Sequence, residues 1–410
     1  MKVTWIGHAC LLLQTSRLNM VTDPWLIDPI FGGVISHHPP RTLGLEDLPE
    51  IDVIALTHAH FDHFDPETLK HLNKNAIVII PAGPLRKIDN KLQSLGFKKI
   101  IRLRPWQTFT HQGFSISATP SVGVPEELGY VLQGEGATVF HAADSLFEPI
   151  AEKIVQKFKI DIAFIPYCGW DQAALFGIEP DKTWEPDYRK LSRSCQLLKT
   201  SIVVPAASNT CWQTEDLKWL NNRVCPGKIE NFFKILSETD PSIQPLRMEP
   251  GECWSKEEGH LPLQRNQKNR DIPSNLQKLP FHYLSFEEVS ETLVNFLKKR
   301  RRQLFISFFY SPKASLSLLT TRFSIASHDG CEERIWAVNL LSRNILGAKK
   351  SHYSVSIAWP DLCQWVRGHC DIQDLILSRK VNLTDCKNQE AFLRLLGIEY
   401  LFHPFCFSPE

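Results

Sequence analysis

Short apolar runs, separated by turn residues, open the chain. Each run has the length and the side chains of a strand, so strands are predicted over residues 3–6, 10–14, 19–22 and 52–56. Helical and strand patterns then alternate, with helices predicted at 66–72, 85–95, 149–158 and 188–198. The strands between them are predicted at 76–80, 100–103, 114–118, 130–133, 138–141, 162–165 and 202–204, with a hairpin turn around Gly134, Glu135 and Gly136.

The pattern changes after residue 254. Residues 255–279 are polar and almost without periodicity, which favours a linker or a long excursion. Beyond them, helices are predicted at 286–299, 360–367 and 389–395 and strands at 304–309 and 322–326. We therefore expect a large domain over 1–254 and a smaller C-terminal α+β domain over 280–410, whose role is open. The basic run at 298–302 fits an interaction patch or a solvated helix end that complements the helix dipole.

Composition narrows the class of protein. A length of 410 residues supports two domains, and 43% hydrophobic residues are ordinary for a globular chain. The 46 Lys and Arg residues balance 45 Asp and Glu residues, which gives no electrostatic case for nucleic acid, so a small-molecule substrate is expected. The eleven cysteines form no C-x-x-C pair, as is typical of reduced cytoplasmic thiols. The first apolar run is too short for a signal peptide or a span, so no membrane partner is expected, and the oligomeric state stays open.

Metal-binding side chains are concentrated in one segment, Thr-His-Ala-His-Phe-Asp-His, directly after the apolar run at 51–56. Two histidines one residue apart at the tip of a strand can turn the same way and hold one ion. The following aspartate and histidine are expected to start a helix and face a second ion. The predicted ligands are His58, His60, Asp62 and His63.

This motif, in a chain that also carries Trp5-Ile-Gly-His-Ala-Cys10 and Thr22-Asp-Pro-Trp25, resembles the metallo-β-lactamase superfamily. The resemblance covers about residues 1–254 and implies an α/β fold, the αββα sandwich, with a dinuclear metal site at one edge of its two sheets. It also implies a bridging aspartate, for which Asp144 at the end of a predicted strand is suited.

Two histidines of the hydrolytic branches have no counterpart here, because neither residues 119–127 nor residues 203–211 contain one. The chain is similar to the metallo-β-lactamase portion of the CMP-N-acetylneuraminate hydroxylases, in residues 22–27, His38-Pro-Pro40 and Pro125-Glu126. By site chemistry it also resembles the diiron hydroxylase of chloramphenicol biosynthesis, in which a glutamate takes the middle position. These resemblances imply that Glu126, or Glu127 as the one-residue alternative, replaces the middle histidine.

Donor chemistry points the same way. Two histidines and a carboxylate form the facial arrangement that suits ferrous iron and leaves positions open for dioxygen. We expect His58, His60 and Glu126 to hold one ion and Asp62 and His63 to hold the other, with Asp144 between them and with Asp144 and Glu126 catalytic. The predicted cofactor is two iron ions. The alternative is zinc, with Glu126 and Glu127 in an exposed turn.

Further residues are candidates for supporting roles. Asp23 ends a predicted strand and could accept a hydrogen bond from a ligand imidazole. His8 could line the site or cap the first turn, and His38, with His37, lies in a loop that could close over the site. Tyr167 and Trp170 follow a buried strand, where they fit either the wall of a substrate pocket or a loop packed on the core.

The leading prediction is a dinuclear iron oxygenase, a hydroxylase or oxidase acting on a small metabolite. The runner-up is a hydrolase of a phosphodiester or lactone, in which a bridging hydroxide attacks. A degenerate site in a binding protein is the third reading. The Cys-x-His and Cys-x-x-His pairs of a Rieske domain are absent from this sequence, so an external electron donor protein, or the substrate, is expected to supply electrons.

Overall fold

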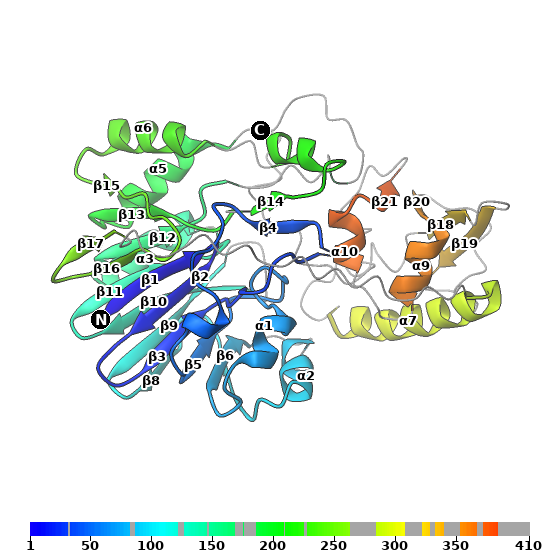
Figure 1. Cartoon of the computed structure of the whole chain (residues 1–410), viewed down its shortest axis with the longest axis horizontal. Helices are drawn as coiled ribbons and strands as arrows, with labels where there is room; N and C mark the ends of the chain where they lie inside the picture. The colour runs from blue at the N-terminus through cyan, green and yellow to red at the C-terminus, as the bar shows by residue number, and fades with distance from the viewer. Residues whose placement is uncertain are drawn as a thin grey trace.

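Two β-sheets packed face to face form the N-terminal part of the chain in the computed structural model (Figure 1). The structure describes residues 1–262, apart from 32, 83–86, 122–126, 146, 169–174, 176–185, 209 and 225–227. Further along it describes 284–307, 322–328, 333–339, 353–366 and 372–383.

The first sheet has eight strands in the order β17-β16-β1-β2-β3-β5-β6-β7. Strand β2 is antiparallel to both β1 and β3, and β3, β5, β6 and β7 are parallel, so β1, β3 and β5 end at the same edge. The strands are β1 (Lys2–Gly7), β2 (Cys10–Gln14), β3 (Asn19–Thr22), β5 (Val53–Ala55), β6 (Ile77–Pro81), β7 (Lys99–Leu103), β16 (Cys253–Ser255) and β17 (Gly259–Leu261).

The second sheet has seven strands in the order β15-β13-β12-β11-β10-β9-β8. Glu135 and Gly136 both have positive φ, 47° and 77°, as the turn of a two-residue hairpin requires, and they join β10 to β11 at the predicted position. The strands are β8 (Thr108–His111), β9 (Phe114–Pro120), β10 (Leu128–Gly134), β11 (Ala137–His141), β12 (Ile162–Ile165), β13 (Ile202–Pro205) and β15 (Gln244–Pro245).

Alternating side chains build three apolar layers from these sheets. Val3 and Leu13 face inward, where they share a core with Tyr130 and Phe164 of the second sheet. Helices α1 (Pro66–His71) and α2 (Lys87–Ser94) cover the outer face of the first sheet. Helices α3 (Glu148–Lys157), α5 (Tyr188–Leu197) and α6 (Ile229–Thr239) cover the outer face of the second. The expected αββα sandwich is confirmed.

Helix α1 begins at Pro66, where the helix at 66–72 was predicted, and not at the metal-ligand motif before it. Asp65 is its N-cap and accepts hydrogen bonds from the backbone N–H groups of Glu67 and Thr68, both at 3.0 Å. Pro66 occupies the first helical position, where its missing N–H is no loss. The expectation that Asp62 and His63 start a helix is therefore wrong: they lie in a tight turn that precedes it.

The C-terminal part contains a separate four-stranded sheet, in the order β19-β18-β20-β21, together with helices. The expected strand at 304–309 is wrong over its first residues, because α7 (Phe286–Ser307) continues through the basic run, whose lysines and arginines are good helix formers. The other elements are α9 (Trp359–Val366), α10 (Ile372–Leu377), β18 (Arg322–His328), β19 (Glu333–Asn339), β20 (Tyr353–Ile357) and β21 (Val381–Leu383).

The two parts of the chain meet beside a small two-stranded sheet, β4 (Ile35–His37) with β14 (Thr210–Trp212). Trp212 Nε1 donates a hydrogen bond to the Leu377 carbonyl of α10 at 2.9 Å, and Figure 1 shows α10 next to these strands. The first sheet extends past residue 254, through β17. The helix predicted at 389–395 lies outside the described residues.

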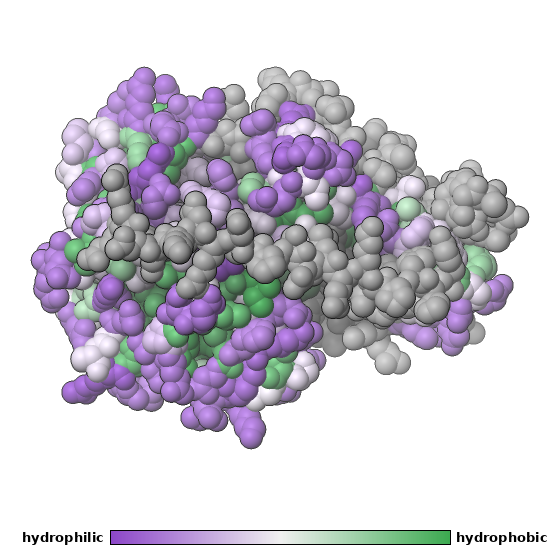
Figure 2. Space-filling model, in the orientation of Figure 1, coloured by the Kyte–Doolittle hydropathy of each residue, from purple (hydrophilic) through white to green (hydrophobic). Residues whose placement is uncertain are grey.

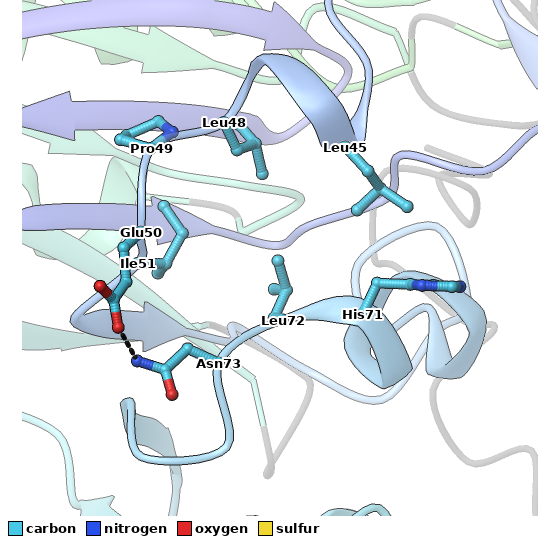
Figure 3. Close-up of a pocket in the computed structure, with 8 residues that line it drawn as sticks. All are labelled: Leu45, Leu48, Pro49, Glu50, Ile51, His71, Leu72 and Asn73. Atoms are coloured by element: carbon cyan, nitrogen blue, oxygen red, sulfur yellow. Dashed lines mark hydrogen bonds between the residues drawn. The ribbon is translucent and has the colours of Figure 1, made fainter.

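The surface in Figure 2 is mainly hydrophilic over the outer helices, with hydrophobic side chains between them. No helix among the described residues is long and apolar enough to cross a membrane. A shallow hollow of about 430 Å³ lies beside the end of α1 (Figure 3). Its lining combines apolar side chains with a hydrogen bond from Asn73 to Glu50, and it includes none of the predicted metal ligands.

Candidate metal centre

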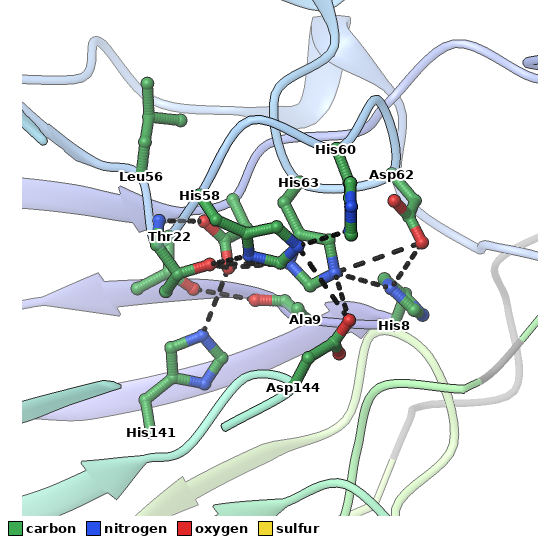
Figure 4. Close-up of polar contacts among 12 residues, drawn as sticks. His8, Ala9, Thr22, Leu56, His58, His60, Asp62, His63, His141 and Asp144 are labelled. Atoms are coloured by element: carbon green, nitrogen blue, oxygen red, sulfur yellow. Dashed lines mark hydrogen bonds and ion pairs between the residues drawn. The ribbon is translucent and has the colours of Figure 1, made fainter. Parts of the chain in front are cut away.

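Three strand ends of the first sheet bring polar side chains to one place. His8 follows β1, Asp23 follows β3, and His58 lies just beyond β5. Since these strands end at the same edge, residues far apart in sequence meet there. Figure 4 shows the His8 and His58 side chains converging with Asp144, which comes from the turn after β11 of the second sheet.

The first group of possible metal donors is His58, His60 and Asp144. His58 Nε2 lies 2.8 Å from His60 Nδ1 and 3.9 Å from Asp144 Oδ2. His58 Nδ1 is 3.0 Å from the Thr57 hydroxyl, which directs the Nε2 side of the ring toward the other donors. The predicted pair of histidines therefore does turn the same way.

The second group is His8, Asp62 and His63. His8 Nε2 lies 3.2 Å from His63 Nε2 and 3.3 Å from Asp62 Oδ2. Asp144 Oδ2 is 3.2 Å from His63 Nε2, so this carboxylate contacts both groups, as a bridging ligand would. The two groups provide nitrogen and carboxylate donors in the combination that zinc and iron sites use.

Asp23 orients the donors from behind. Its carboxylate is fully buried and accepts hydrogen bonds from the Thr57 N–H and the Thr57 hydroxyl, both at 2.7 Å. Its Oδ2 also lies 3.0 Å from His63 Nδ1. A carboxylate accepts only, so Nδ1 of His63 carries a proton and Nε2 is the nitrogen that faces the donor cluster.

The charges of the cluster favour a bound cation. Burial acts to raise the pKa of Asp144, but His63 and His58 hold it well below its usual value, so the carboxylate is ionised. Burial acts to lower the pKa of His63, but Asp144 and Asp62 raise it well above its usual value. Ionised carboxylates that draw positive charge onto a buried imidazole present the field that a metal ion would satisfy, so the residues fit a metal.

Glu127 is the carboxylate that the structure describes within residues 119–127, the segment in which the hydrolytic branches have their middle histidine. It is 3% exposed and accepts hydrogen bonds from Ser121 Oγ at 3.0 Å and Ser145 Oγ at 3.3 Å. Burial, reinforced by the negative charge of Asp144, raises the pKa of Glu127 to about 8. Glu126 lies outside the described residues, so its assignment stays a prediction.

Three residues around the cluster have a strained backbone. His8, Asp23 and Ala143 have positive φ values of 49°, 38° and 51°, in a region that non-glycine residues rarely adopt. Such residues tend to gather at functional sites, where the surrounding structure holds them.

Other predicted site residues are placed differently. Tyr167 is half-buried and packs on the apolar layer beneath α3 and α5. Of the two roles considered for it, this position fits a loop residue packed on the core. Trp170 lies outside the described residues, and His38 is exposed. His141 is buried with Nε2 3.5 Å from Asp23 Oδ2, on the far side of that carboxylate from the donors (Figure 4).

A buried group beside the cluster had no sequence signal. His37 Nδ1 lies 3.0 and 3.1 Å from the two oxygens of Asp28, and Arg41 Nε donates to the same carboxylate at 2.9 Å. Burial, together with Arg41 and His8, lowers the pKa of His37 to about 4 against the opposing effect of Asp28. Asp28, His37 and Arg41 are irregularly spaced in a Pro-rich segment, so the sequence gave no reason to group them. The residues of the motif at 58–63, in contrast, lie close together in sequence.

Comparison with known proteins matches part of the chain to a family model. Residues 24–204 match the model of the beta-lactamase superfamily domain. A putative Rieske 2Fe-2S iron-sulfur protein of Mycobacterium tuberculosis is 28% identical over 248 residues, which cover 54% of this chain and 46% of that protein. A metal-dependent hydrolase of Methanosphaerula palustris is 29% identical over 182 residues, 41% of this chain and 72% of the relative.

A shorter match agrees with the resemblance to the hydroxylases. The cytidine monophosphate-N-acetylneuraminic acid hydroxylase of Danio rerio is 39% identical over 74 residues, 18% of this chain and 12% of that enzyme. Among solved structures, the diiron β-hydroxylase CmlA from Streptomyces venezuelae is similar at 19% identity and a TM-score of 0.45, covering 61% of this chain and 53% of that one.

The chain spans about half the length of the Rieske relatives that it matches. The matched region includes the motif at 58–63, Glu127 and Asp144, and it lies within the two-sheet sandwich. The chain therefore carries a beta-lactamase superfamily domain over residues 24–204.

Proposed function

We propose that this protein is a dinuclear non-haem iron oxygenase that acts on a small-molecule metabolite. One observation supports the proposal: the segment in which the hydrolytic branches have their middle histidine carries Glu126 and Glu127 instead, and Glu127 is buried within electrostatic reach of Asp144. His58, His60 and Asp144 already offer one ion two nitrogen donors and a carboxylate, and Glu126 or Glu127 would add a second carboxylate.

The surrounding residues support this assignment. Iron bound there would supply the electrons that activate dioxygen. Asp23 and Thr57 hold the His58 and His63 rings in place, which keeps the donors fixed while ligands exchange at the open positions. Ser121 and Ser145 hold the Glu127 carboxylate from two sides.

Electron supply is proposed to come from a Rieske-type iron-sulfur protein. The relatives described as Rieske proteins match this chain over about half of their own length. A Rieske centre transfers one electron at a time, which suits stepwise reduction of a dinuclear iron site.

Metal analysis and oxygen uptake test the proposal. Protein from iron-replete medium is expected to hold iron and to consume dioxygen after chemical reduction. Loss of oxygen uptake with retention of bound metal is expected in Glu127→His if Glu127 is the ligand, and in Glu126→His if Glu126 is, so the pair of variants tells the two candidate carboxylates apart. Zinc alone in the native protein, with no oxygen uptake, would remove the proposal.

A hydrolase of a phosphodiester or lactone is the second candidate. His8 favours it, because a fourth histidine makes the centre richer in nitrogen, as zinc hydrolases prefer. Its Methanosphaerula relative, described as a metal-dependent hydrolase, is also matched over most of its length. Turnover of such esters by iron-free, anaerobic protein would select this alternative.

A further inference from the structure

His8 occupies a position from which it can bind metal. Its Nε2 is 3.2 Å from His63 Nε2 and 3.3 Å from Asp62 Oδ2, and its side chain is buried. Its backbone is fixed on both sides, because the His8 carbonyl accepts hydrogen bonds from Trp5 Nε1 at 2.9 Å and from Ala207 N at 3.2 Å. The ring is therefore held at the donor group by the fold.

The ring has a second nitrogen to satisfy. If Nε2 gives its lone pair to a metal, Nδ1 carries the proton and must donate it to an acceptor. Among the described residues, no hydrogen-bond partner reaches His8 Nδ1. A buried donor without a partner costs free energy, so the site needs an acceptor.

His37 also has a buried ring nitrogen without a partner in the part of the chain that the structure describes, and this nitrogen is an acceptor. Its Nδ1 donates to Asp28, which leaves Nε2 as a lone-pair acceptor, and that atom too has no partner among the described residues. A Cβ placed on Gly7 would lie 2.9 Å from His37 Cδ2 and 3.5 Å from Nε2. The Nε2 edge of His37 therefore faces the backbone immediately before His8.

Trp25 keeps the two rings close together. Its ring stacks on His37 with centroids 3.7 Å apart and meets His8 edge-on at 5.7 Å. A buried polar gap between a donor and an acceptor is where an ordered water makes two hydrogen bonds.

We propose that His8 ligates the second metal ion through Nε2, taking the place of the missing last histidine, and that His37 accepts the His8 Nδ1 proton through one water. His37 is then a positioning residue, oriented by Asp28, and Arg41 completes the buried chain. The inference rests on the proposed dinuclear centre but holds for iron or zinc.

Cobalt binding to metal-free protein tests the ligand, by stoichiometry and by the visible absorption of the bound ion. Wild type is expected to bind two ions per chain and His8→Gly one. Glycine suits this position because φ is 49°, and the lost ring leaves room for free imidazole, which should restore the second ion. The matched control is His38→Ala, an exposed neighbour of the site, which should bind two ions.

Two further variants test the positioning residue. His37→Phe keeps the stacking on Trp25 but removes the acceptor, so the second ion should bind roughly 10- to 100-fold more weakly. His37→Gln, whose amide oxygen accepts a hydrogen bond, should recover part of that loss.

The outcomes distinguish the ligand role of His8 from the positioning role of His37. Two ions in His8→Gly with unchanged affinity and spectrum would overturn the ligand role while leaving a dinuclear enzyme. Unchanged affinity in His37→Phe would overturn the positioning role. Fewer than two ions in wild type would remove both the dinuclear centre and this inference.

Discussion

Nδ1 of His63 lies 3.0 Å from Oδ2 of Asp23, the same oxygen that accepts the Thr57 hydroxyl at 2.7 Å. Because Thr57 in turn contacts His58 Nδ1 at 3.0 Å, one buried carboxylate orients a histidine from each donor group. The two halves of the centre are therefore coupled through a residue that need not touch metal.

Asp23→Asn should weaken both ions. The asparagine amide is uncharged, and its N–H₂ group would face Thr57 and His63, which need an acceptor there. Metal affinity is therefore expected to fall roughly 10- to 100-fold. Competition with a chelator measures it. Asp52→Asn is the matched control, because Asp52 accepts only a backbone N–H at the opposite end of β3. Loss of one ion with full retention of the other would contradict the coupling.

Thr57→Val should act mainly on the His58 side. The substitution removes the hydroxyl between Asp23 and His58 but leaves the contact of Asp23 with His63 intact. The ion at His58 and His60 should bind about tenfold more weakly, and Thr57→Ser should restore it. Equal loss in the valine and serine variants would mean that the hydroxyl is not the cause.

Tyr130→Phe should destabilise the sandwich beside the metal centre. The buried Tyr130 hydroxyl donates to the Leu56 carbonyl at 2.7 Å and so links β10 to the end of β5. Loss of this hydrogen bond should cost about 1–2 kcal/mol in the free energy of unfolding, measured in urea. Tyr188→Phe, which loses a hydroxyl contact to Lys228 N far from the site, should cost stability without changing metal affinity. An unchanged free energy of unfolding in Tyr130→Phe would contradict the stabilising role of this hydrogen bond.

Acid should destabilise the protein in two windows. The pKa of His37 is lowered from 6.5 to about 4, so unfolding takes up a proton in that range and stability falls as the pH falls through it. Burial acts to raise the pKa of Asp28, but His37 and Arg41 hold it at about 2, so its contribution is present above 3.8 and lost as the pH falls to about 2. Urea unfolding of metal-free protein at pH 7, 5 and 3 measures both windows. His37→Phe should remove the upper one; a pH dependence identical to wild type would contradict the assignment.

Sequence patterns located most strands of the sandwich because their apolar runs are short and bounded by turn residues. The pair β4 and β14 was not predicted, since three-residue strands carry too little periodicity to detect. The extension of α7 was missed because the apolar residues at 304–307 fit a strand locally, and their helical state is set by the chain before them.

The site was predictable where its residues are close in sequence. The motif at 58–63 contributes four donors from one loop, whereas the contact of His8 with His63 depends on how β1, β3 and β5 are ordered in the sheet. Glu127 and Asp144 approach each other only because β10 and β11 are neighbours. Strand order of this kind is a tertiary property that local patterns do not encode.

The pairing of β1 with β16 sets a time order for folding of the first sheet. Trp5 exchanges backbone hydrogen bonds with Gly251 and Glu252, so the strand that presents His8 gains its outer neighbour from a segment about 250 residues later. During synthesis on the ribosome that neighbour emerges long after the 58–63 loop. The sheet around the strand that leads to His8 is therefore completed only when most of the sandwich has been synthesised, and a chain halted earlier would carry an exposed strand edge open to aggregation.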